Sequence, residues 1–310
     1  MPAERFIARS KAMRALADRI RRFARSDSNV LVAGETGSGK NAVARELHLR
    51  GKRAKMPFVT IDCPSLSSSL IDSELFGHER GAFTDAITAR AGRFELAGSG
   101  TVFLDAVTEL PLEAQSKLLR IVEDKRVERL GGSVAFTVSA RLIASSSADI
   151  EDAVRAGLFR HDLFHRLRVL PLLVPPLRER RDDVLPLARY FATRAVAAAK
   201  RPAPAFSRDA SEALRDYAWP GNVRELRHVV EMACQTSIHT VTLTDLPDEV
   251  LTTPDPTEKG PDRQPTLDEM ERRYVAATLR AVGGNQTEAA ARLGISRKAL
   301  WEKRKRYGMA

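Results

Sequence analysis

Short apolar runs alternate with helical patterns over the first half of the chain. Four runs have the length and the branched side chains of buried strands: Val30–Ala33, Phe58–Asp62, Thr101–Asp105 and Leu142–Ser145. Segments with helical periodicity, such as Ala42–Leu47, lie between them. Strands that alternate with helices indicate a parallel sheet covered by helices. We therefore predict an α/β domain over residues 1–172.

The second half of the chain has a different pattern. After Pro175-Pro176, helical patterns over Asp183–Lys200, Ser207–Ala218 and Val223–Ser237 follow one another without a convincing strand between them. This predicts a helical subdomain over residues 173–251. Residues 252–265 contain four prolines and no apolar periodicity, so we expect an extended linker there.

The last segment, residues 266–310, predicts three helices at about Leu267–Ala281, Thr287–Leu293 and Ser296–Tyr307. Ser296 is a capping candidate for the last helix. Gly294 lies in the short turn between the last two helices. A short glycine-containing turn between two helices is typical of a helix-turn-helix.

The charge of the chain favours an anionic partner. Fifty Lys and Arg residues against 40 Asp and Glu residues give a net charge of +10 and a pI near 9.9. From Thr266 onward, ten bases and five acids give +5, which is half of the excess. We interpret the last predicted helix as a segment that would enter the major groove of DNA, with a solvated basic helix as the alternative. The candidate DNA-binding residues are Arg297, Lys298, Trp301 and Arg304, of which Trp301 is expected to be partly core.

A glycine-rich segment follows the first predicted strand and precedes a helix. Its residues form a G-x4-G-K pattern: Gly34, Glu35, Thr36, Gly37, Ser38, Gly39 and Lys40. Glycines let backbone N–H groups turn towards a phosphate, the helix start adds a positive field, and the lysine adds a charge. We predict ATP binding at this loop, with Asn41 at the position where the pattern usually has a magnesium-binding Ser or Thr.

Asp105 ends the third predicted strand and is followed by Ala106. A carboxylate at this position can hold Mg²⁺ against the β- and γ-phosphates of ATP. We therefore expect Asp105 to be the metal-binding residue of a magnesium–ATP site. An acid would be expected next to it in an ATP-hydrolysing protein, and this chain has an alanine there.

Other functional classes receive little support from the sequence. Cys63 and Cys234 match no metal or disulfide spacing and are expected to be small core residues in a reducing compartment. The six histidines show no ligand cluster. No apolar stretch approaches the roughly 20 residues that cross a bilayer, and the N-terminus lacks a signal-peptide core. We expect a cytoplasmic protein without a membrane partner.

Several segments resemble the sigma-54-dependent transcriptional activators, also called bacterial enhancer-binding proteins, which are AAA+ ATPases. Residues 74–86 (ELFGHERGAFTDA) are similar to the family's ELFGHE-x-GAFTGA sequence. Further similarity runs through residues 158–167, 175–180 and 219–226, and the last unit resembles the family's Fis-type helix-turn-helix. The resemblance extends from about Phe6 to Met309. It implies an AAA+ parallel-sheet nucleotide domain, a helical lid and a DNA-binding domain.

The resemblance also implies partners and site residues. The family forms homo-oligomers, ring hexamers, with ATP at subunit interfaces and with promoter-upstream DNA as a partner. Arg160 and Arg166 match the arginine fingers offered to a neighbouring subunit, and Arg224 matches the sensor II arginine. The loop that contacts sigma-54 in its RNA polymerase complex corresponds to Gly81, Ala82, Phe83, Thr84, Asp85 and Ala86.

The departures from the family pattern concentrate around the attacking water. Ala106 replaces the glutamate that would orient or deprotonate this water, Asp62 replaces the asparagine that holds that glutamate, and Ser147 replaces the sensor I asparagine. Loss of a positioned general base typically lowers a rate by about 10²–10⁴-fold. Phosphate binding depends on other groups, so we expect ATP binding to persist while hydrolysis is impaired. Asp85 replaces the second glycine of the contact loop and adds a charge that weakens the expectation of a sigma-54 contact.

Two alternatives concern the missing acid. Glu109 lies four residues past Asp105, where the family also has a glutamate, so we expect it to keep a structural role rather than replace the lost acid. An engineered Glu-to-Ala change would also explain Ala106. The simultaneous changes at Asp62, Ser147, Val107 and Thr108 favour natural divergence.

Two functional hypotheses follow. The first is a DNA-bound transcription regulator in which ATP is a structural ligand that stabilises an oligomer. The second is an active ATP-hydrolysing sigma-54 activator that remodels the closed polymerase complex. A clamp-loader or helicase-like AAA+ protein would explain neither the contact loop nor the Fis-like tail. Because the family pattern begins near Phe6, we expect no receiver domain before it and expect control by expression, a partner protein or a small ligand.

Overall fold

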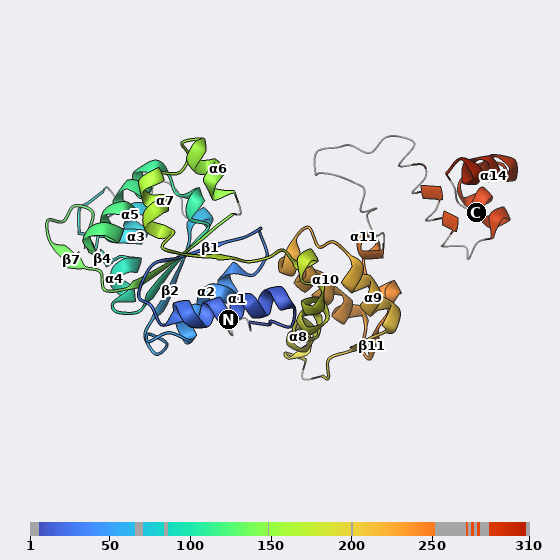
Figure 1. Ribbon diagram of the computed structural model, residues 1–310, viewed down its shortest axis with the longest axis horizontal. Helices are drawn as coiled ribbons and strands as arrows, with labels where there is room; N and C mark the ends of the chain where they lie inside the picture. Colours follow the sequence, from blue (N-terminus) through green and yellow to red (C-terminus); the bar gives the residue numbers. More distant parts are fainter. Residues whose placement is uncertain are drawn as a thin grey trace. The chain divides into compact units, whose positions relative to one another are not determined.

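The computed structural model describes residues 6–65, 71–83, 86–147, 149–199, 201–251, 271, 274–275, 278–279 and 285–307. The chain divides into two compact units, Met1–Thr253 and Pro254–Ala310 (Figure 1). Within the described residues, no helix has both the length and the apolar character that a bilayer crossing requires.

A five-stranded parallel sheet forms the centre of the first unit. Its strands are β1 (Val30–Ala33), β2 (Phe58–Asp62), β5 (Thr101–Asp105), β8 (Arg141–Ser146) and β9 (Leu170–Leu173). They lie in the order β2-β5-β8-β1-β9, with every pairing parallel. All four strands predicted from the sequence are present, and the α/β fold class is confirmed.

The fifth strand, β9, was missed by the sequence analysis. It lies at one edge of the sheet and contains Pro171, and only Leu172 of its four residues is buried. A proline is tolerated at a sheet edge because one side of an edge strand needs no ladder hydrogen bonds. A strand exposed along most of its length lacks the continuous apolar run by which central strands are recognised.

Alternate residues of the strands face two different cores, which makes the domain a three-layer structure. Leu31 and Leu104 belong to the cluster on one face, whereas Val32 and Phe103 belong to the cluster on the other. This alternation follows from the two-residue period of a strand. The side chains of both faces are apolar because helices cover both sides.

Helices α1 (Lys11–Ala24) and α2 (Lys40–Leu49) pack on one face of the sheet. The other face carries the remaining helices of the domain, and Figure 1 shows the two groups on opposite sides. These are α3 (Ile71–Phe76), α4 (Arg93–Ala97), α5 (Leu112–Asp124), α6 (Ile150–Arg155) and α7 (His161–Leu167). Two short antiparallel pairs, β3 (Gly77–His78) with β4 (Arg90–Ala91) and β6 (Arg126–Glu128) with β7 (Ala135–Thr137), complete the domain.

The residues after the sheet form the predicted helical lid. Its helices are α8 (Val184–Val196), α9 (Arg208–Asp216), α10 (Asn222–Thr236) and α11 (Asp248–Leu251). They pack around Trp219, which is fully buried and donates from Nε1 to the Leu214 carbonyl at 2.8 Å. The expectation of no strand here was wrong, because β10 (Ala205–Phe206) pairs in parallel with β11 (Thr240–Val241). Two-residue strands are too short to show a periodicity.

The second unit contains α13 (Gln286–Arg292) and α14 (Arg297–Arg306). The Asn285 side chain accepts from Thr287 N and Glu288 N, and Ser296 Oγ accepts from Ala299 N, so both helices are capped as such residues predict. Gly294 has φ 68° in the turn between them. Most of the expected helix at 267–281 and the whole linker at 252–265 lie outside the described residues.

Candidate functional site

The phosphate-binding loop connects β1 to α2, as its sequence pattern predicts. Gly39 precedes the first helical residue, Lys40, and has φ 100°. Gly37 has φ 76°, and a Cβ at this position would lie 2.4 Å from the Gly221 carbonyl oxygen of the lid. Only glycine therefore fits at Gly37, for two reasons: the left-handed backbone and the close approach of the lid.

The Lys40 side chain folds into this loop. Its Nζ donates to the carbonyl oxygens of Gly34 at 2.7 Å and Glu35 at 3.0 Å. Burial lowers the pKa of Lys40, while the Asp105 carboxylate opposes this shift and the Arg224 guanidinium adds to it. The structure thus brings Lys40, Asp105 and Arg224 within electrostatic reach of one another. These groups come from β1–α2, β5 and the lid helix α10.

Asn222 of the lid forms hydrogen bonds to the phosphate-binding loop. Its amide nitrogen donates to Glu35 Oε2 at 3.0 Å and to the Thr36 carbonyl at 3.1 Å, and its Oδ1 accepts from Leu177 N at 2.8 Å. Asn222 is fully buried and has φ 55°. Asparagine tolerates this left-handed conformation better than most residues. The position of the lid over the loop therefore depends on a buried amide that the sequence analysis did not select.

We predict that Asn222→Ala lowers the free energy of unfolding by about 2–4 kcal/mol, because it leaves buried polar groups without partners and places alanine at positive φ. Asn222→Gly removes the same hydrogen bonds but accepts the backbone conformation, so it should cost about 1 kcal/mol less. Urea unfolding of both variants checks this. A wild-type midpoint for the alanine variant would contradict the role given to the amide.

Two arginines also join the lid to the loop. Arg178 donates to both carboxylate oxygens of Glu35, at 2.9 and 2.6 Å, and these hydrogen bonds lower the pKa of Glu35. Arg180 is buried and donates to the Ser38 carbonyl. Burial lowers the pKa of Arg180 to about 10, against the opposing effect of Asp183. The sequence signal was the arginine-rich stretch after Pro175-Pro176, but no spacing rule links it to residues 35 and 38.

A small apolar cavity of about 40 Å³ lies beside the loop. Its walls include Ile7 from the N-terminal segment, Gly39 from the loop, and Leu187, Tyr190 and Val223 from the lid. Ligand pockets typically have volumes of roughly 300–1,000 Å³, so this cavity is an apolar recess beside the loop and not a formed pocket for a ring. The sequence analysis also missed this cavity, because its walls come from three distant segments.

The altered catalytic positions lie at the carboxyl ends of three adjacent strands. Asp62 ends β2, Asp105 ends β5, and the two are partners in the strand register. Ser147 follows β8, the next strand, and is exposed. Ligands of parallel α/β sheets bind at this edge. The three departures identified in the sequence therefore share one edge of the sheet with the phosphate-binding loop.

Ser145 connects Asp105 to Ala106. Its Oγ donates to Asp105 Oδ1 at 2.5 Å and accepts from Ala106 N at 2.9 Å. Ala106 has φ 55° and ψ 56°, a conformation that is unfavourable for alanine. The backbone is thus held in a left-handed conformation at the position where the family has its glutamate. A methyl group at Ala106 has no atom that could accept a proton from water.

Both cysteines are free and buried, as expected. Burial raises the pKa of the Cys63 thiol to about 12, and the carboxylates of Asp105, Asp62 and Glu109 contribute to the shift. Cys63 therefore stays a neutral thiol at physiological pH.

Arg160 is the residue before α7 and Arg166 lies within this helix, which packs against α5. Arg160 precedes the helix and forms a two-point ion pair with Asp162, at 3.0 and 2.7 Å. Arg166 pairs with Glu123 at 2.8 Å. Both side chains are exposed to a considerable degree, 39% for Arg160 and 62% for Arg166. These contacts are within the chain and include none with the phosphate-binding loop.

The contact loop extends beyond β3. Gly81 N donates to the Ala86 carbonyl at 2.8 Å, and Ala86 N donates to the Phe83 carbonyl at 2.9 Å. Phe83 is 39% exposed and its ring lies 5.0 Å from that of His78. Thr84 and Asp85 lie outside the described residues. The described part is a closed turn that carries an aromatic side chain at its surface.

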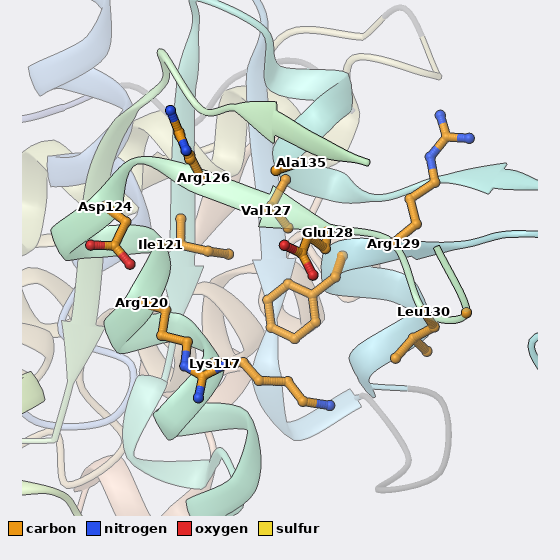
Figure 2. Close-up of a pocket in the computed structure, with 12 residues that line it drawn as sticks. Lys117, Arg120, Ile121, Asp124, Arg126, Val127, Glu128, Arg129, Leu130 and Ala135 are labelled. Atoms are coloured by element: carbon orange, nitrogen blue, oxygen red, sulfur yellow. The ribbon is translucent and has the colours of Figure 1, made fainter. Parts of the chain in front are cut away.

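A hollow of about 820 Å³ lies beside the base of this loop (Figure 2). Figure 2 shows side chains of α5, including Lys117 and Asp124, together with Val127 and Glu128 of β6 around it. Leu130, which also lines the hollow, donates from N to the Gly77 carbonyl at 2.9 Å and accepts from Glu79 N at 2.9 Å. The wall of the hollow thus supports the contact loop.

The candidate DNA-binding residues all lie on α14. Arg297, Lys298 and Trp301 are exposed, and Arg304 is partly exposed. The expectation that Trp301 is partly core was wrong: it is 56% exposed, whereas its neighbour Leu300 is buried. Lys305 lies 5.5 Å from the Trp301 ring centroid in a cation–π contact. Leu300 packs into the small core of this unit while the neighbouring Trp301 is turned away from it, so the indole stays on the basic surface.

Comparison with known proteins identifies the family. Residues 6–173 match the sigma-54 interaction domain, residues 178–262 the AAA+ ATPase lid domain, and residues 266–307 the bacterial regulatory protein, Fis family. The chain belongs to the sigma-54-dependent transcriptional regulators. Sigma-54-dependent regulators of this architecture bind a nucleotide in the AAA+ domain and DNA through the Fis-type unit, and they act with sigma-54 RNA polymerase.

Individual regulators of the family are similar over almost the whole chain. The alginate biosynthesis transcriptional regulatory protein AlgB of Pseudomonas aeruginosa is 43% identical over 302 residues, which cover 97% of this chain and 67% of AlgB. The transcriptional regulatory protein ZraR of Klebsiella oxytoca is 43% identical over 306 residues, 97% of this chain and 69% of ZraR. Among solved structures, NtrX from Brucella abortus in complex with ATP is 33% identical with a TM-score of 0.73, over 99% of this chain and 70% of NtrX.

Proposed function

We propose that this sigma-54-family regulator binds magnesium–ATP but hydrolyses it slowly, so that the nucleotide acts mainly as a structural ligand of a DNA-bound oligomer. The observation that carries the proposal is Ala106, which follows the Asp105 carboxylate at the sheet edge without any proton acceptor of its own. Phosphate release by the purified protein, with and without DNA, tests the proposal. Turnover at the rate of a relative with an intact glutamate would contradict it.

ATP binding is supported by the groups that the fold gathers around the loop. The residues Gly34, Glu35, Thr36, Gly37, Ser38, Gly39, Lys40 and Asn41 form the loop and the start of α2. Lys40 and Arg224 would neutralise the phosphates, and Asp105 would hold the magnesium ion, directly or through water. The adenine ring would lie against the apolar side chains beside Gly39, which would have to move apart to admit it. The NtrX structure with ATP is a relative in which a nucleotide is bound.

Impaired hydrolysis is supported by three residues that differ from the family pattern at positions expected to act on the attacking water. Ala106 offers no base, Asp62 replaces the amide that would hold one, and Ser147 replaces the sensor I asparagine at the end of β8. A missing general base alone typically lowers the rate by about 10²–10⁴-fold. Glu109 is exposed and is the last residue of the 3-10 helix Val107–Glu109, so its position is set by that turn, which suits a structural role better than rescue of the reaction.

The alternative function is an active sigma-54 activator that remodels the closed polymerase complex. It is favoured by the retained loop, Asp105, and the closed turn with its exposed Phe83. The same phosphate-release assay separates the two functions, because an activator requires sustained turnover. Asp85 adds a negative charge to the sequence of the contact loop and weakens this alternative.

Assembly into a ring, with a hexamer as the family's form, is part of the proposal. Arg160 and Arg166 are exposed on α7, and each is held by an acidic residue of the same chain. Such a surface ion pair contributes little stability. The arginine can therefore leave its acidic partner and bind the γ-phosphate of an ATP molecule at the interface with a neighbouring subunit. Sedimentation with and without ATP would show whether the nucleotide drives assembly.

We predict that Arg297→Ala and Arg304→Ala each weaken promoter binding. A residue that contacts a base should cost about 1–3 kcal/mol and relax specificity, and one that contacts phosphate should reduce the salt slope by about 1. Fluorescence anisotropy over a range of salt concentrations distinguishes the two cases. Arg208→Ala is the matched control, since it removes one arginine that is 88% exposed on the lid. Unchanged affinity in both helix variants would remove these arginines from the DNA surface.

A further inference from the structure

Two histidines lie one turn apart on the surface of α7. His161 and His165 are both exposed, and their Nε2 atoms are 3.1 Å apart. The ring centroids are separated by 4.3 Å, with the planes at 66°. The sequence analysis found no histidine cluster, but a spacing of four residues places both side chains on the same face of a helix.

The distance between the two nitrogens matches that of two ligands on one metal ion. With metal–nitrogen bonds of about 2.05 Å, a separation of 3.1 Å corresponds to an angle of about 98° at the metal. This lies between the roughly 90° of square-planar or octahedral sites and the roughly 109° of tetrahedral ones. The two Nε2 atoms face each other in a hydrogen bond, and metal binding requires both rings to carry their proton on Nδ1, which leaves both Nε2 lone pairs available.

The helix that carries the pair is held in place. Leu163, Phe164 and Leu167 are buried beneath it, and the Phe164 ring lies 5.3 Å from that of His165. The two imidazoles therefore start close to the geometry in which they would chelate. A chelating pair that is already ordered loses little conformational entropy when a ligand binds.

Neighbouring positive charges would repel a cation, but each is paired. Arg160 is bound to Asp162, Arg166 to Glu123, and Arg168 to Glu151 at 2.9 Å. These three arginines and their acidic partners together carry no net charge, so they add little positive potential at the histidines. A divalent cation approaching from solvent meets two imidazoles and no unpaired arginine among these three.

We propose that His161 and His165 form a bidentate site for a divalent first-row transition cation, with Cu²⁺ bound more tightly than Ni²⁺ or Zn²⁺. Imidazole suits these metals, and the order of affinity follows the Irving–Williams series. Among the described residues, no group of three or more His, Cys, Asp or Glu side chains could hold a metal. The pair is thus the complete protein contribution within the described chain, and water fills the other coordination positions.

The test uses the full chain, purified without a polyhistidine tag and without nucleotide, and titrated with Cu²⁺. Calorimetry should show one site per chain, and the Cu²⁺ electron paramagnetic resonance spectrum should show coupling to two imidazole nitrogens. His161→Ala or His165→Gln should each weaken binding by about tenfold or more, since even loss of an outer-sphere partner costs 10–100-fold. The double variant should lose the site.

The matched control is His228→Ala/His239→Ala, which removes two other exposed histidines, both from the lid. It should bind Cu²⁺ as the wild type does. Circular dichroism of every variant verifies that the fold is intact. Equal Cu²⁺ affinity in the wild type and in the His161/His165 double variant, or a spectrum with only one coupled nitrogen, would overturn the proposal. Because no nucleotide is present, this outcome is independent of ATP hydrolysis.

Discussion

Ala106→Glu is expected to raise the rate of ATP hydrolysis by about 10²–10⁴-fold, the range that a positioned general base contributes. The new carboxylate would be attached directly after Asp105, at the sheet edge that carries the phosphate-binding loop. The backbone there is left-handed already, with φ 55°. The left-handed backbone conformation has a similar conformational cost for alanine and for glutamate, so the substitution should not unfold the protein.

The residues around position 106 determine how far Ala106→Glu raises the hydrolysis rate. Asp62 would repel a new carboxylate rather than hold it, since it ends the strand next to Asp105. Ser147 has a shorter side chain than the sensor I asparagine. We therefore expect Ala106→Glu with Ser147→Asn, or with Asp62→Asn, to exceed the single variant in a steady-state phosphate-release assay.

The control for this experiment is Ala106→Gln, which has nearly the same shape as glutamate but cannot take a proton at neutral pH. It should bind ATP and remain slow. If the wild type already hydrolysed ATP as fast as the glutamate variant, the missing acid would have no effect on the rate, and the proposed function would be wrong. If glutamine raised the rate as much as glutamate, the effect would be one of packing.

Lys40→Ala is expected to weaken ATP binding by roughly 10²–10³-fold. A hydrogen bond to a charged group contributes about 1.5–3 kcal/mol, and one lysine can reach two phosphates, which gives a loss of about 3–4 kcal/mol. Within the described part of the chain, Lys40 donates to the carbonyls of Gly34 and Glu35 of its own loop. Its removal should therefore change the unfolding midpoint little.

Calorimetric titration with magnesium–ATP measures this effect. Lys52→Ala is a suitable control, since it removes an exposed lysine of the same charge from the turn after α2. Lys40→Arg keeps the charge but not the compact ammonium group, and should recover only part of the affinity. An alanine variant that bound ATP like the wild type would show that Lys40 does not contact the phosphates.

The pattern of apolar residues predicted most of the fold. The three central strands β1, β5 and β8 were recognisable because each is buried on both faces, which requires a continuous apolar run. The edge strand β2 was recognisable from its branched and aromatic residues, although only Ile61 is buried. The lid helices and the turn around Gly294 were predictable from helical periodicity and from capping residues. The edge strand β9 and the short pair β10–β11 were not, because exposure or shortness removes the local signal.

The chemistry near the phosphates was predictable where it depends on local sequence. The loop, Asp105 and the missing glutamate are each defined by residues next to one another in the chain. Arg224 was placed by resemblance alone, and the fold brings it into electrostatic contact with Lys40. The hydrogen bonds that Asn222 and Arg180 of the lid donate to the phosphate-binding loop could not be predicted, since they join residues more than 140 positions apart.

The local sequence was enough to predict the α/β domain, the helical lid, the helix-turn-helix and the phosphate-binding loop, because each has a signature of hydrophobic period, capping residue or glycine spacing within a short stretch of chain. Only the tertiary structure decided which distant side chains meet. It placed Asp62, Ala106 and Ser147 at one sheet edge, left Trp301 exposed, and brought the nitrogens of His161 and His165 within 3.1 Å. Such meetings depend on strand order, helix orientation and rotamer, none of which a local pattern specifies.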